Sequence, residues 1–295
     1  MQTLESMRKR IHGAEDLYAV VRVMKALAAV SIRQYERAVE SLTQYSHTIE
    51  QGLQIVLRNR PDEITPSKPL ADHRWGAIVF GSDQGMCGSF NEQVVSLALE
   101  HLDAQSTNLV VGTRAATRLE DAGLTIDSQF AVPGSVAGIT PIVHGLVVRI
   151  EELRFERGIE RFFLFHNRSI SGAAARAHRL QLLPVDPLWL RGLEKRNWPS
   201  QTLPTFTMNW RRLFSSLIRQ HLFVTLYRAF AESLANENAS RLASMQAAER
   251  NIQEHLTELT TRYHENRQQS ITEELLDIVA GFEMLTEGKK PNGFR

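Results

Sequence analysis

The sequence predicts an α/β protein with long helices, in which an antiparallel two-helix coiled coil carries a small Rossmann-like middle domain. Three observations carry this prediction. All but one of the ten prolines lie between Pro61 and Pro204, both flanking segments repeat apolar residues at coiled-coil spacing, and the middle alternates strand-like with helical runs. We expect three parts: an N-terminal coiled-coil helix (1–60), an α/β domain (61–204), and a C-terminal helix with a tip (205–295).

The N-terminal segment has an apolar seam over its whole length, which only Lys25 and Ser46 interrupt. A repeat every 3.5 residues predicts a coiled coil. At a rise of 1.5 Å per residue, the two end segments would form helices roughly 90 and 130 Å long, so we expect them to project from the globule as a rod. The seam comprises Leu4, Met7, Ile11, Ala14, Tyr18, Val21, Lys25, Ala28, Ile32, Tyr35, Val39, Leu42, Ser46, Ile49, Leu53 and Val56.

The C-terminal segment repeats the same spacing, with Glu249 as its polar break. Pairing of the two ends across the middle domain requires an antiparallel arrangement, although self-dimerisation through either seam is the alternative. The longer C-terminal helix would overhang its partner at about 267–285, where apolar residues point in several directions. Such a helix needs a sleeve from other subunits. The seam comprises Leu242, Met245, Glu249, Ile252, Leu256, Leu259 and Tyr263.

The middle segment predicts a small, mostly parallel sheet that helices cover on both faces. A glycine-rich turn, 81–91, follows its first strand. The turn has neither the Gly-Lys-Ser/Thr of a P-loop nor the dinucleotide spacing, and no histidine lies near Cys87 in the sequence. We expect a packing turn without cofactor, metal or catalytic residue; a small nucleotide-binding enzyme is a third hypothesis. The expected strands are 74–80, 108–113 and 161–166, and the expected helices are 92–102, 141–155 and one from Arg114.

Composition indicates an ordinary soluble chain, with 43% apolar residues, 23% charged residues and a net charge of +1. We expect no secretory signal and no membrane-spanning helix, and a single Cys87 fits a reducing compartment. Basic residues gather near the start, including Arg8, Lys9 and Arg10. They form a solvated helix face or a docking strip for an acidic protein; no aromatic residues interleave with them, which argues against nucleic acid.

Three blocks resemble the gamma subunit of F-type ATP synthases, the central stalk rotor. The first is Arg8-Lys9-Arg10-Ile11 followed by Val23-Met24-Lys25. The second is the loop Ser-Asp-Gln-Gly-Met-Cys-Gly-Ser-Phe-Asn at 82–91. The most specific block begins with Glu237-Asn-Ala-Ser-Arg241-Leu and continues with Tyr263-x-x-x-Arg-Gln-x-x-Ile-Thr-x-Glu-Leu to Gly281.

The resemblance implies a non-catalytic rotor that couples ion flow through the membrane c-subunit ring to the catalytic beta subunits. Its implied partners are the alpha and beta subunits of the hexamer, the epsilon subunit and the c ring, without nucleic acid or direct membrane insertion. It implies a peripheral location on the cytoplasmic face of a bacterial plasma membrane. The implied subunit contacts are Met24, Lys25, Arg241, Gln268, Thr272, Glu274 and, at the tip in its apolar bearing, Phe282, Met284 and Leu285.

The chain departs from the family pattern at several positions. Asp16-Leu17-Tyr18 replaces a polar stretch, Ser31 replaces a common lysine, and Glu249-Arg250 replaces a small, uncharged pair. Glu283 makes the tip more polar than is usual. These departures favour a divergent or alternate F-type complex, and the choice between proton and sodium belongs to the membrane ring.

Overall fold

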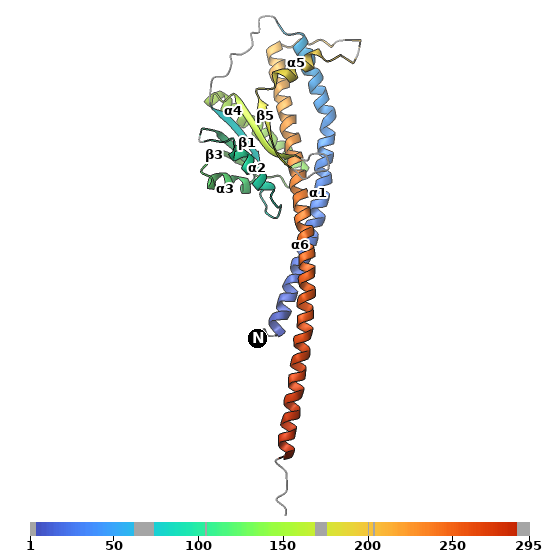
Figure 1. The fold of residues 1–295 in the computed structure, drawn as a ribbon. Helices are drawn as coiled ribbons and strands as arrows, with labels where there is room; N and C mark the ends of the chain where they lie inside the picture. The colour runs from blue at the N-terminus through green and yellow to red at the C-terminus, as the bar shows by residue number, and fades with distance from the viewer. Residues whose placement is uncertain are drawn as a thin grey trace, which may run out of the picture. The chain divides into compact units, whose positions relative to one another are not determined.

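The computed structural model describes residues 4–61, 74–103, 105–168, 176–199, 201–202 and 204–287, and Figure 1 shows its fold. The chain divides into two compact units. Leu27–Ser244 forms one, and Met1–Ala26 together with Met245–Arg295 forms the other. The two long helices, α1 (Leu4–Arg58) and α6 (Trp210–Glu287), contribute to both units.

The coiled-coil prediction is confirmed, because α1 and α6 bury the predicted seam positions against each other. In the unit that holds the chain ends, Met7 and Val21 of α1 and Met245 and Leu259 of α6 are buried. Within Leu27–Ser244, the seam positions Ala28, Tyr35, Ile49, Leu53 and Val56 are buried as well. Apolar burial at this spacing, rather than helix propensity, stabilises helices of this length.

Polar contacts fix the end of α1 beside the start of α6. The Asn209 side-chain oxygen accepts hydrogen bonds from the backbone N–H groups of Arg211 and Arg212, at 3.0 and 3.4 Å, and so caps the first turn of α6. Trp210 donates its indole N–H to the carbonyl of Val56 at 2.7 Å. α5 (Pro187–Lys195) joins them through Trp189, whose ring stacks on His221 of α6.

The middle of the chain forms a five-stranded sheet in the order β3-β2-β1-β4-β5. β1 (Trp75–Phe80) lies at its centre and pairs in parallel with β2 (Thr107–Val111) and β4 (Arg161–Arg168). β3 (Ile126–Phe130) continues the parallel part, whereas β5 (Arg176–Leu183) runs antiparallel at the other edge. The predicted mostly parallel sheet is therefore confirmed.

Helices cover both faces of this sheet. Ile78, Phe80 and Leu109 face a core shared with α4 (Ile139–Arg157), which a short helix η1 (Val136–Gly138) precedes, and with α6. Ala77, Val79 and Val110 alternate to the opposite face. There α2 (Phe90–Leu99) and α3 (Thr113–Asp121) supply residues such as Val94 and Leu119. The long helix α6 is thus part of the domain's own core.

The sequence did not predict β3, β5 or α5. β3 and β5 are edge strands with polar and basic residues at many positions, so they lack the continuous apolar run that marks β1. α5 has nine residues and begins at Pro187, with Asp186 accepting a hydrogen bond from the N–H of Leu188 at 2.8 Å. This proline-and-aspartate start is an ordinary helix signal that the proline-based division treated as a break.

Phe230 ties α6 to the sheet and gives a test of this core. It is fully buried, and its ring centroid lies 4.7 Å from that of Phe80 on β1. We expect Phe230→Ala to lower the free energy of unfolding by about 3–5 kcal/mol, because it removes a large side chain and leaves a cavity. Urea denaturation monitored by circular dichroism measures the change.

Phe155 on α4 is the matched control, because 93% of its surface is exposed. Phe155→Ala is expected to change the free energy of unfolding by no more than about 0.5 kcal/mol. Equal losses for the two variants would contradict the assignment of Phe230 to the core.

Candidate functional site: the helical seam and the exposed end of α6

Lys25, the charged break in the α1 seam, pairs with Glu249, the polar break in the α6 seam. The Lys25 ammonium donates a hydrogen bond to Oε2 of Glu249. The side chains are 33% and 18% exposed, so the pair is partly shielded from water. A charge in an apolar seam destabilises it unless it is paired, and here each helix supplies the counter-charge that the other needs.

The same antiparallel register continues toward the start of α1. Arg8 donates to the hydroxyl of Tyr263 at 3.1 Å and lies over its ring, and Asn266 lies 3.2 Å from the sulfur of Met7. Met24, next to Lys25, is half-buried. On the same helix Leu17, Val20 and Val23 are each more than half exposed, which forms an apolar surface that the sequence analysis did not identify.

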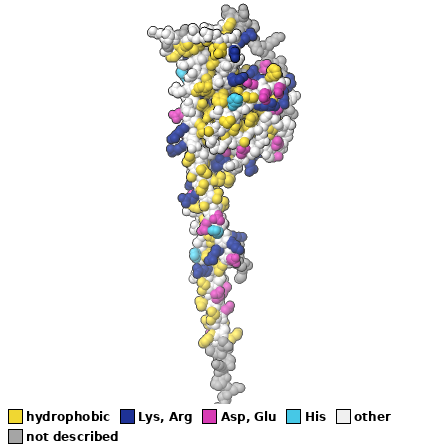
Figure 2. Space-filling model, turned by 180° about the vertical axis from the view of Figure 1, so that it is seen from behind, with side chains coloured by type: hydrophobic (Ala, Val, Ile, Leu, Met, Phe, Trp, Pro, Cys, Tyr) yellow, Lys and Arg dark blue, Asp and Glu magenta, His cyan; other side chains and the backbone are white. Residues whose placement is uncertain are grey.

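Beyond Asn266, α6 continues with its side chains in solvent. Every residue from 271 to 284 is exposed, which agrees with the expected overhang. Figure 2 shows apolar side chains at the surface along this end of the helix. The exposed fractions reach 68% for Phe282 and 78% for Met284. The large apolar residues exposed here are Ile271, Leu275, Leu276, Ile278, Val279, Phe282 and Met284.

The other residues of the implied contact set are placed differently. Gln268, Thr272 and Glu274 are exposed on α6, with the Thr272 hydroxyl donating to the carbonyl of Gln268 at 2.9 Å. The side chain of Leu285 lies outside the described residues. Arg241, in the other unit, is buried.

Arg241 is held within its own helix. Its guanidinium donates to Oε1 of Glu237, one turn earlier, at 2.6 Å, and the two side chains are 9% and 6% exposed. Burial raises the pKa of Glu237, and the charge of Arg241 offsets part of that shift. In this conformation Arg241 therefore neutralises a buried carboxylate.

The glycine-rich turn is filled by its own side chains. Asn91 accepts from the N–H of Ser82 at 2.9 Å and donates to its hydroxyl at 2.7 Å, and Cys87 is buried against both. Asp83 accepts from the N–H of Thr113 and of Val132, at 2.8 and 2.7 Å, and so ties the turn to α3 and the chain after β3.

The glycines around the turn permit close backbone approach. Gly112, which follows β2, has a φ of +99°, and a Cβ there would lie 2.7 Å from the backbone nitrogen of Ser82. A Cβ on Gly81 would lie 2.3 Å from that of Ala115. These glycines therefore serve packing, and the N–H groups of Ser82, Thr113 and Val132 are already engaged within the chain.

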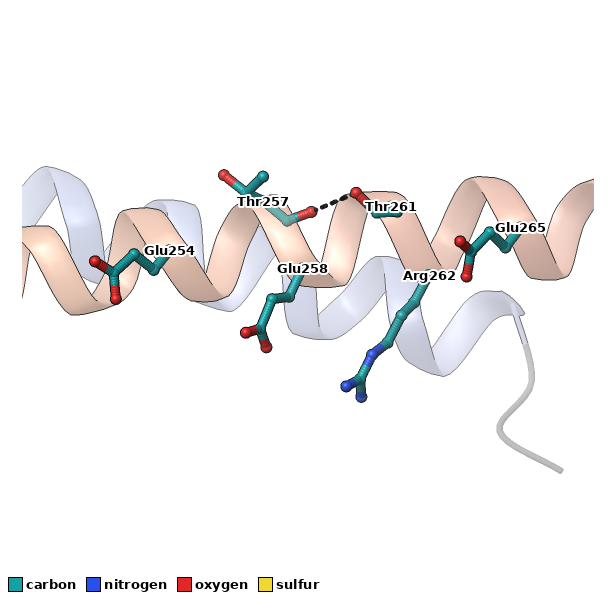
Figure 3. Close-up of a pocket in the computed structure, with 6 residues that line it drawn as sticks. All are labelled: Glu254, Thr257, Glu258, Thr261, Arg262 and Glu265. Carbon is teal, nitrogen blue, oxygen red and sulfur yellow. Dashed lines mark hydrogen bonds between the residues drawn. The ribbon is translucent and has the colours of Figure 1, made fainter.

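A shallow hollow on α6 is lined only by the helix's own residues. Figure 3 shows the six side chains along α6, with α1 passing behind the helix. Thr261 donates to the carbonyl of Thr257 at 3.0 Å, and the three glutamates are spread along the helix. This is a solvated polar face. The lining residues are Glu254, Thr257, Glu258, Thr261, Arg262 and Glu265.

Within the described ranges, no group of three or more acidic, histidine or cysteine side chains is placed to hold a metal ion. In the same ranges, no helix is both long and apolar enough to cross a membrane. The described residues thus show a pair of long helices with a charged seam contact and an exposed apolar helix end, an arrangement typical of proteins that dock with other proteins.

Comparison with known proteins identifies the family. The family model described as ATP synthase matches residues 3–285. The ATP synthase gamma chain of Polynucleobacter asymbioticus is 24% identical over 95% of this chain and 99% of that relative. The ATP synthase gamma chain of Nostoc punctiforme is 26% identical over 97% and 100%. The chain therefore belongs to the ATP synthase gamma-chain family, as a central-stalk rotor subunit without a catalytic site of its own.

Solved structures share the fold. A chain of the Euglena gracilis mitochondrial ATP synthase, in an OSCP/F1/c-ring structure, matches with a TM-score of 0.66 and 16% identity, and covers 99% of both chains. A chain of the Tetrahymena thermophila mitochondrial enzyme, in a central stalk/c-ring structure, matches with a TM-score of 0.52 and 19% identity, over 78% of this chain and 99% of that one. The expected fold class is thereby confirmed.

The buried histidine of β4 predicts a specific acid sensitivity. Burial lowers the pKa of His166 from 6.5 to about 4, and neighbouring His178 and Arg168 add to the effect. Because the unfolded chain takes up this proton first, His166 makes the fold less stable as the pH falls from about 6.5 to 4. The full difference corresponds to about 3 kcal/mol.

We expect His166→Gln to flatten the pH dependence of the unfolding free energy in that window, as measured by urea denaturation at a series of pH values. His144→Gln, at an exposed position on α4, is the control and should leave the slope as in the wild type. An unchanged slope in His166→Gln would show that the histidine has the same pKa in the folded and the unfolded chain, and would contradict the prediction.

Proposed function

We propose that this rotor subunit transmits torque to the beta subunits of a hexamer through α1 and α6. In the same proposal the middle domain joins the epsilon subunit and the membrane c ring. Rotation would move each beta subunit through its catalytic states, so that ion flow drives ATP synthesis and hydrolysis drives the reverse. The observation that carries the proposal is the apolar end of α6, exposed over 271–284.

An isolated helix with this much exposed apolar surface requires an enclosing partner. Tip residues Phe282, Met284 and Leu285 would enter an apolar bearing made by the hexamer. The other helix, α1, also exposes apolar side chains that a partner would cover, at Leu17, Val20 and Val23. A self-dimerising adaptor is less well supported, because its coiled-coil seam is already buried within one chain.

The polar contacts with beta subunits would lie on either side of the Lys25–Glu249 pair. Met24 and Lys25 face an acidic lever of a beta subunit in this proposal, and Gln268, Thr272 and Glu274 are exposed for such contacts. Arg241 would contribute only after separating from Glu237, because that pair is buried. Its contact with a beta subunit thus requires a local rearrangement.

Glu249 would compete with the lever of the beta subunit for the ammonium of Lys25. The Lys25 ammonium can be shared between Glu249 in its own chain and a carboxylate on the beta subunit. A rotor contact must form and break at each step, so it must not be very strong in any one position. An internal counter-ion meets this need, because the ammonium does not become an unpaired seam charge when the lever leaves.

The proposed location is the cytoplasmic face of a bacterial plasma membrane, as a peripheral part of the complex. Its support is the bacterial source of the relatives described above. Contact with a c ring is supported by the matched chains, which come from F1/c-ring and central stalk/c-ring structures.

Assembly tests the apolar end directly. We expect the triple variant Ile278→Ser, Phe282→Ser, Met284→Ser to bind a cognate alpha–beta hexamer at least about tenfold more weakly, because each substitution removes apolar area that the partner would bury. Native mass spectrometry of the mixed subunits, with titration of the chain, measures both stoichiometry and affinity. The wild-type chain alone should have the mass of a monomer.

The control replaces apolar residues of similar exposure elsewhere, in Phe155→Ser, Leu188→Ser, Met208→Ser. This variant should assemble with the hexamer like the wild type. A stable dimer of the chain alone, or equal loss of assembly in both triple variants, would overturn the proposed role of the helix end.

Coupling tests the Lys25–Glu249 pair. We expect Lys25→Ala to leave the complex assembled but to change ion pumping relative to ATP hydrolysis. Glu249→Gln should change the same ratio because it frees the ammonium, and the double variant should match Lys25→Ala because Glu249 acts through Lys25. Both rates are measured on reconstituted vesicles.

Glu254→Gln is the charge-matched control, since Glu254 is exposed on the solvated face of α6. A wild-type pumping ratio in Lys25→Ala would show that Lys25 is only a solvated residue at the seam edge. If the pumping ratio changes in Lys25→Ala but not in Glu249→Gln, Lys25 keeps its proposed role in coupling. Glu249 would then not compete with the beta subunit for the ammonium.

A further inference from the structure

The buried pair of Glu237 and Arg241 on α6 makes fewer hydrogen bonds than its groups allow. One guanidinium nitrogen donates to Oε1 of Glu237 at 2.6 Å, and another lies 3.5 Å from Oδ1 of Asn238. Within the described ranges, Oε2 of Glu237 and Nε of Arg241 are buried and have no hydrogen-bond partner. An arginine and a carboxylate frequently form two parallel hydrogen bonds, so this pair is held less firmly than its burial suggests.

Tyr35 of α1 lies against this pair. It is 5% exposed and belongs to the same buried cluster as Leu234, three residues before Glu237 on α6. Burial and the charge of Glu237 raise the pKa of Tyr35, and only Arg241 opposes them. Among the described residues, the Tyr35 hydroxyl makes no hydrogen bond. The hydroxyl therefore keeps its proton, and it is an unused donor close to a carboxylate that lacks one.

The glycine-rich turn adds a second negative charge to this region. A Cβ on Gly88 would lie 3.4 Å from the hydroxyl of Ser244, which places the turn beside α6 three residues after Arg241. The carboxylate of Asp83 raises the pKa of Glu237, in addition to the larger effect of burial. Among the described residues, the groups that act on this carboxylate are Arg241, Asp83 and the tyrosine hydroxyl, and only the arginine is positive.

Departure of Arg241 would leave Glu237 as an unpaired buried charge. The proposed contact of Arg241 with a beta subunit requires this departure. A buried carboxylate without a counter-ion is strongly unfavourable, because burial has removed its hydration. Uptake of a proton relieves it, and so does a new hydrogen-bond donor. Separation of the pair admits the proton from solvent, and Tyr35 already lies close by as the donor.

We propose that Tyr35 and one proton from solvent replace Arg241 at Glu237 each time Arg241 turns to a beta subunit. The proton binds to one carboxyl oxygen, the Tyr35 hydroxyl donates to the other, and the proton returns to solvent when Arg241 comes back. Tyr35 is thus a positioning residue that acts on Arg241 through Glu237. This exchange rests on the proposed contact of Arg241 with a beta subunit, and it makes that contact sensitive to pH.

The full-length chain alone tests the exchange, because Arg241→Gln imitates the separated pair without a hexamer. The folded variant should hold a proton on Glu237 above the ordinary carboxyl pKa of 4.5. Its stability is then complete at low pH and is lost as the pH rises through the raised pKa. Relative to the double variant Glu237→Gln, Arg241→Gln, its unfolding constant should rise by up to about tenfold per pH unit, the limit for one proton. Urea denaturation between about pH 5 and about pH 8 measures both.

Tyr35→Phe removes the donor alone. In the Arg241→Gln background it should raise the unfolding constant about tenfold at about pH 8 and less at about pH 5, because a donor stabilises a carboxylate more than a carboxylic acid. Tyr45→Phe is the matched control on α1, since the Tyr45 hydroxyl donates to Gln220 at 2.8 Å, and its effect should not depend on pH. Equal effects of the two tyrosine variants at both pH values would contradict the role of Tyr35.

The reconstituted complex tests the link to rotation. Ion pumping relative to ATP hydrolysis is measured on vesicles at about pH 6 and about pH 9. Tyr35→Phe should lower this ratio at the higher pH and leave it unchanged at the lower pH, where a proton already neutralises Glu237. Tyr45→Phe should follow the wild type at both. Because Tyr35→Phe keeps the ion pair, this measurement decides the matter where variants of Arg241 do not fold.

The two arms separate the exchange from the proposed function. If Arg241→Gln and the double variant have the same pH dependence, Glu237 takes up no proton and the exchange is wrong, whatever the complex does. If the chain alone behaves as expected but Tyr35→Phe pumps like the wild type at both pH values, the contact of Arg241 with a beta subunit is wrong. The exchange would then play no part in rotation.

Discussion

The packing of α1 against α6 is the interaction on which the rest of this molecule depends. Helical stability in proteins comes mostly from packing of an apolar face, and here burial of seam residues such as Met7, Val21 and Leu259 supplies it. The same α6 carries Phe230 into the core of the sheet domain. One helix therefore belongs to the domain core and to the partner-binding part, and the domain's folding fixes where the seam begins.

The charged residues that interrupt this apolar seam show how the two helices are aligned. An unpaired charge between two helices would destabilise them, yet both seams contain one, and the two meet as Lys25 and Glu249. The Glu237–Arg241 pair within α6 likewise joins two opposite charges, with both side chains under a tenth exposed. The first pair is partly exposed to solvent, whereas the second is buried. The first pair joins two helices and the second lies within one helix, so the two have different structural roles.

Much of the fold could be predicted because helices and buried strands leave periodic traces. The seam positions and β1 could be predicted from the spacing of apolar residues, because these side chains must be buried for the chain to fold. β5 and β3 were missed because an edge strand needs fewer apolar residues. Lys25 and Glu249 were each identified as seam breaks, but their contact depends on the register between two helices, which spacing within one helix does not give. The burial of Arg241 was missed for a related reason. The resemblance to a family identifies which residue stands at a position, but it does not show whether that residue is exposed.

The glycine-rich turn lies where phosphates often bind, but in this chain its own side chains fill it. Asn91 and Asp83 occupy the donors that a ligand would need, and Gly81 and Gly112 bring backbones too close to leave space. The turn's polar groups instead stabilise the domain that anchors α6. Exposed apolar surface is concentrated at the far end of the same helix, where burial by a partner would stabilise both helix and complex. The domain is therefore stabilised by its own core. The exposed end of α6 would gain stability only when a partner covers it.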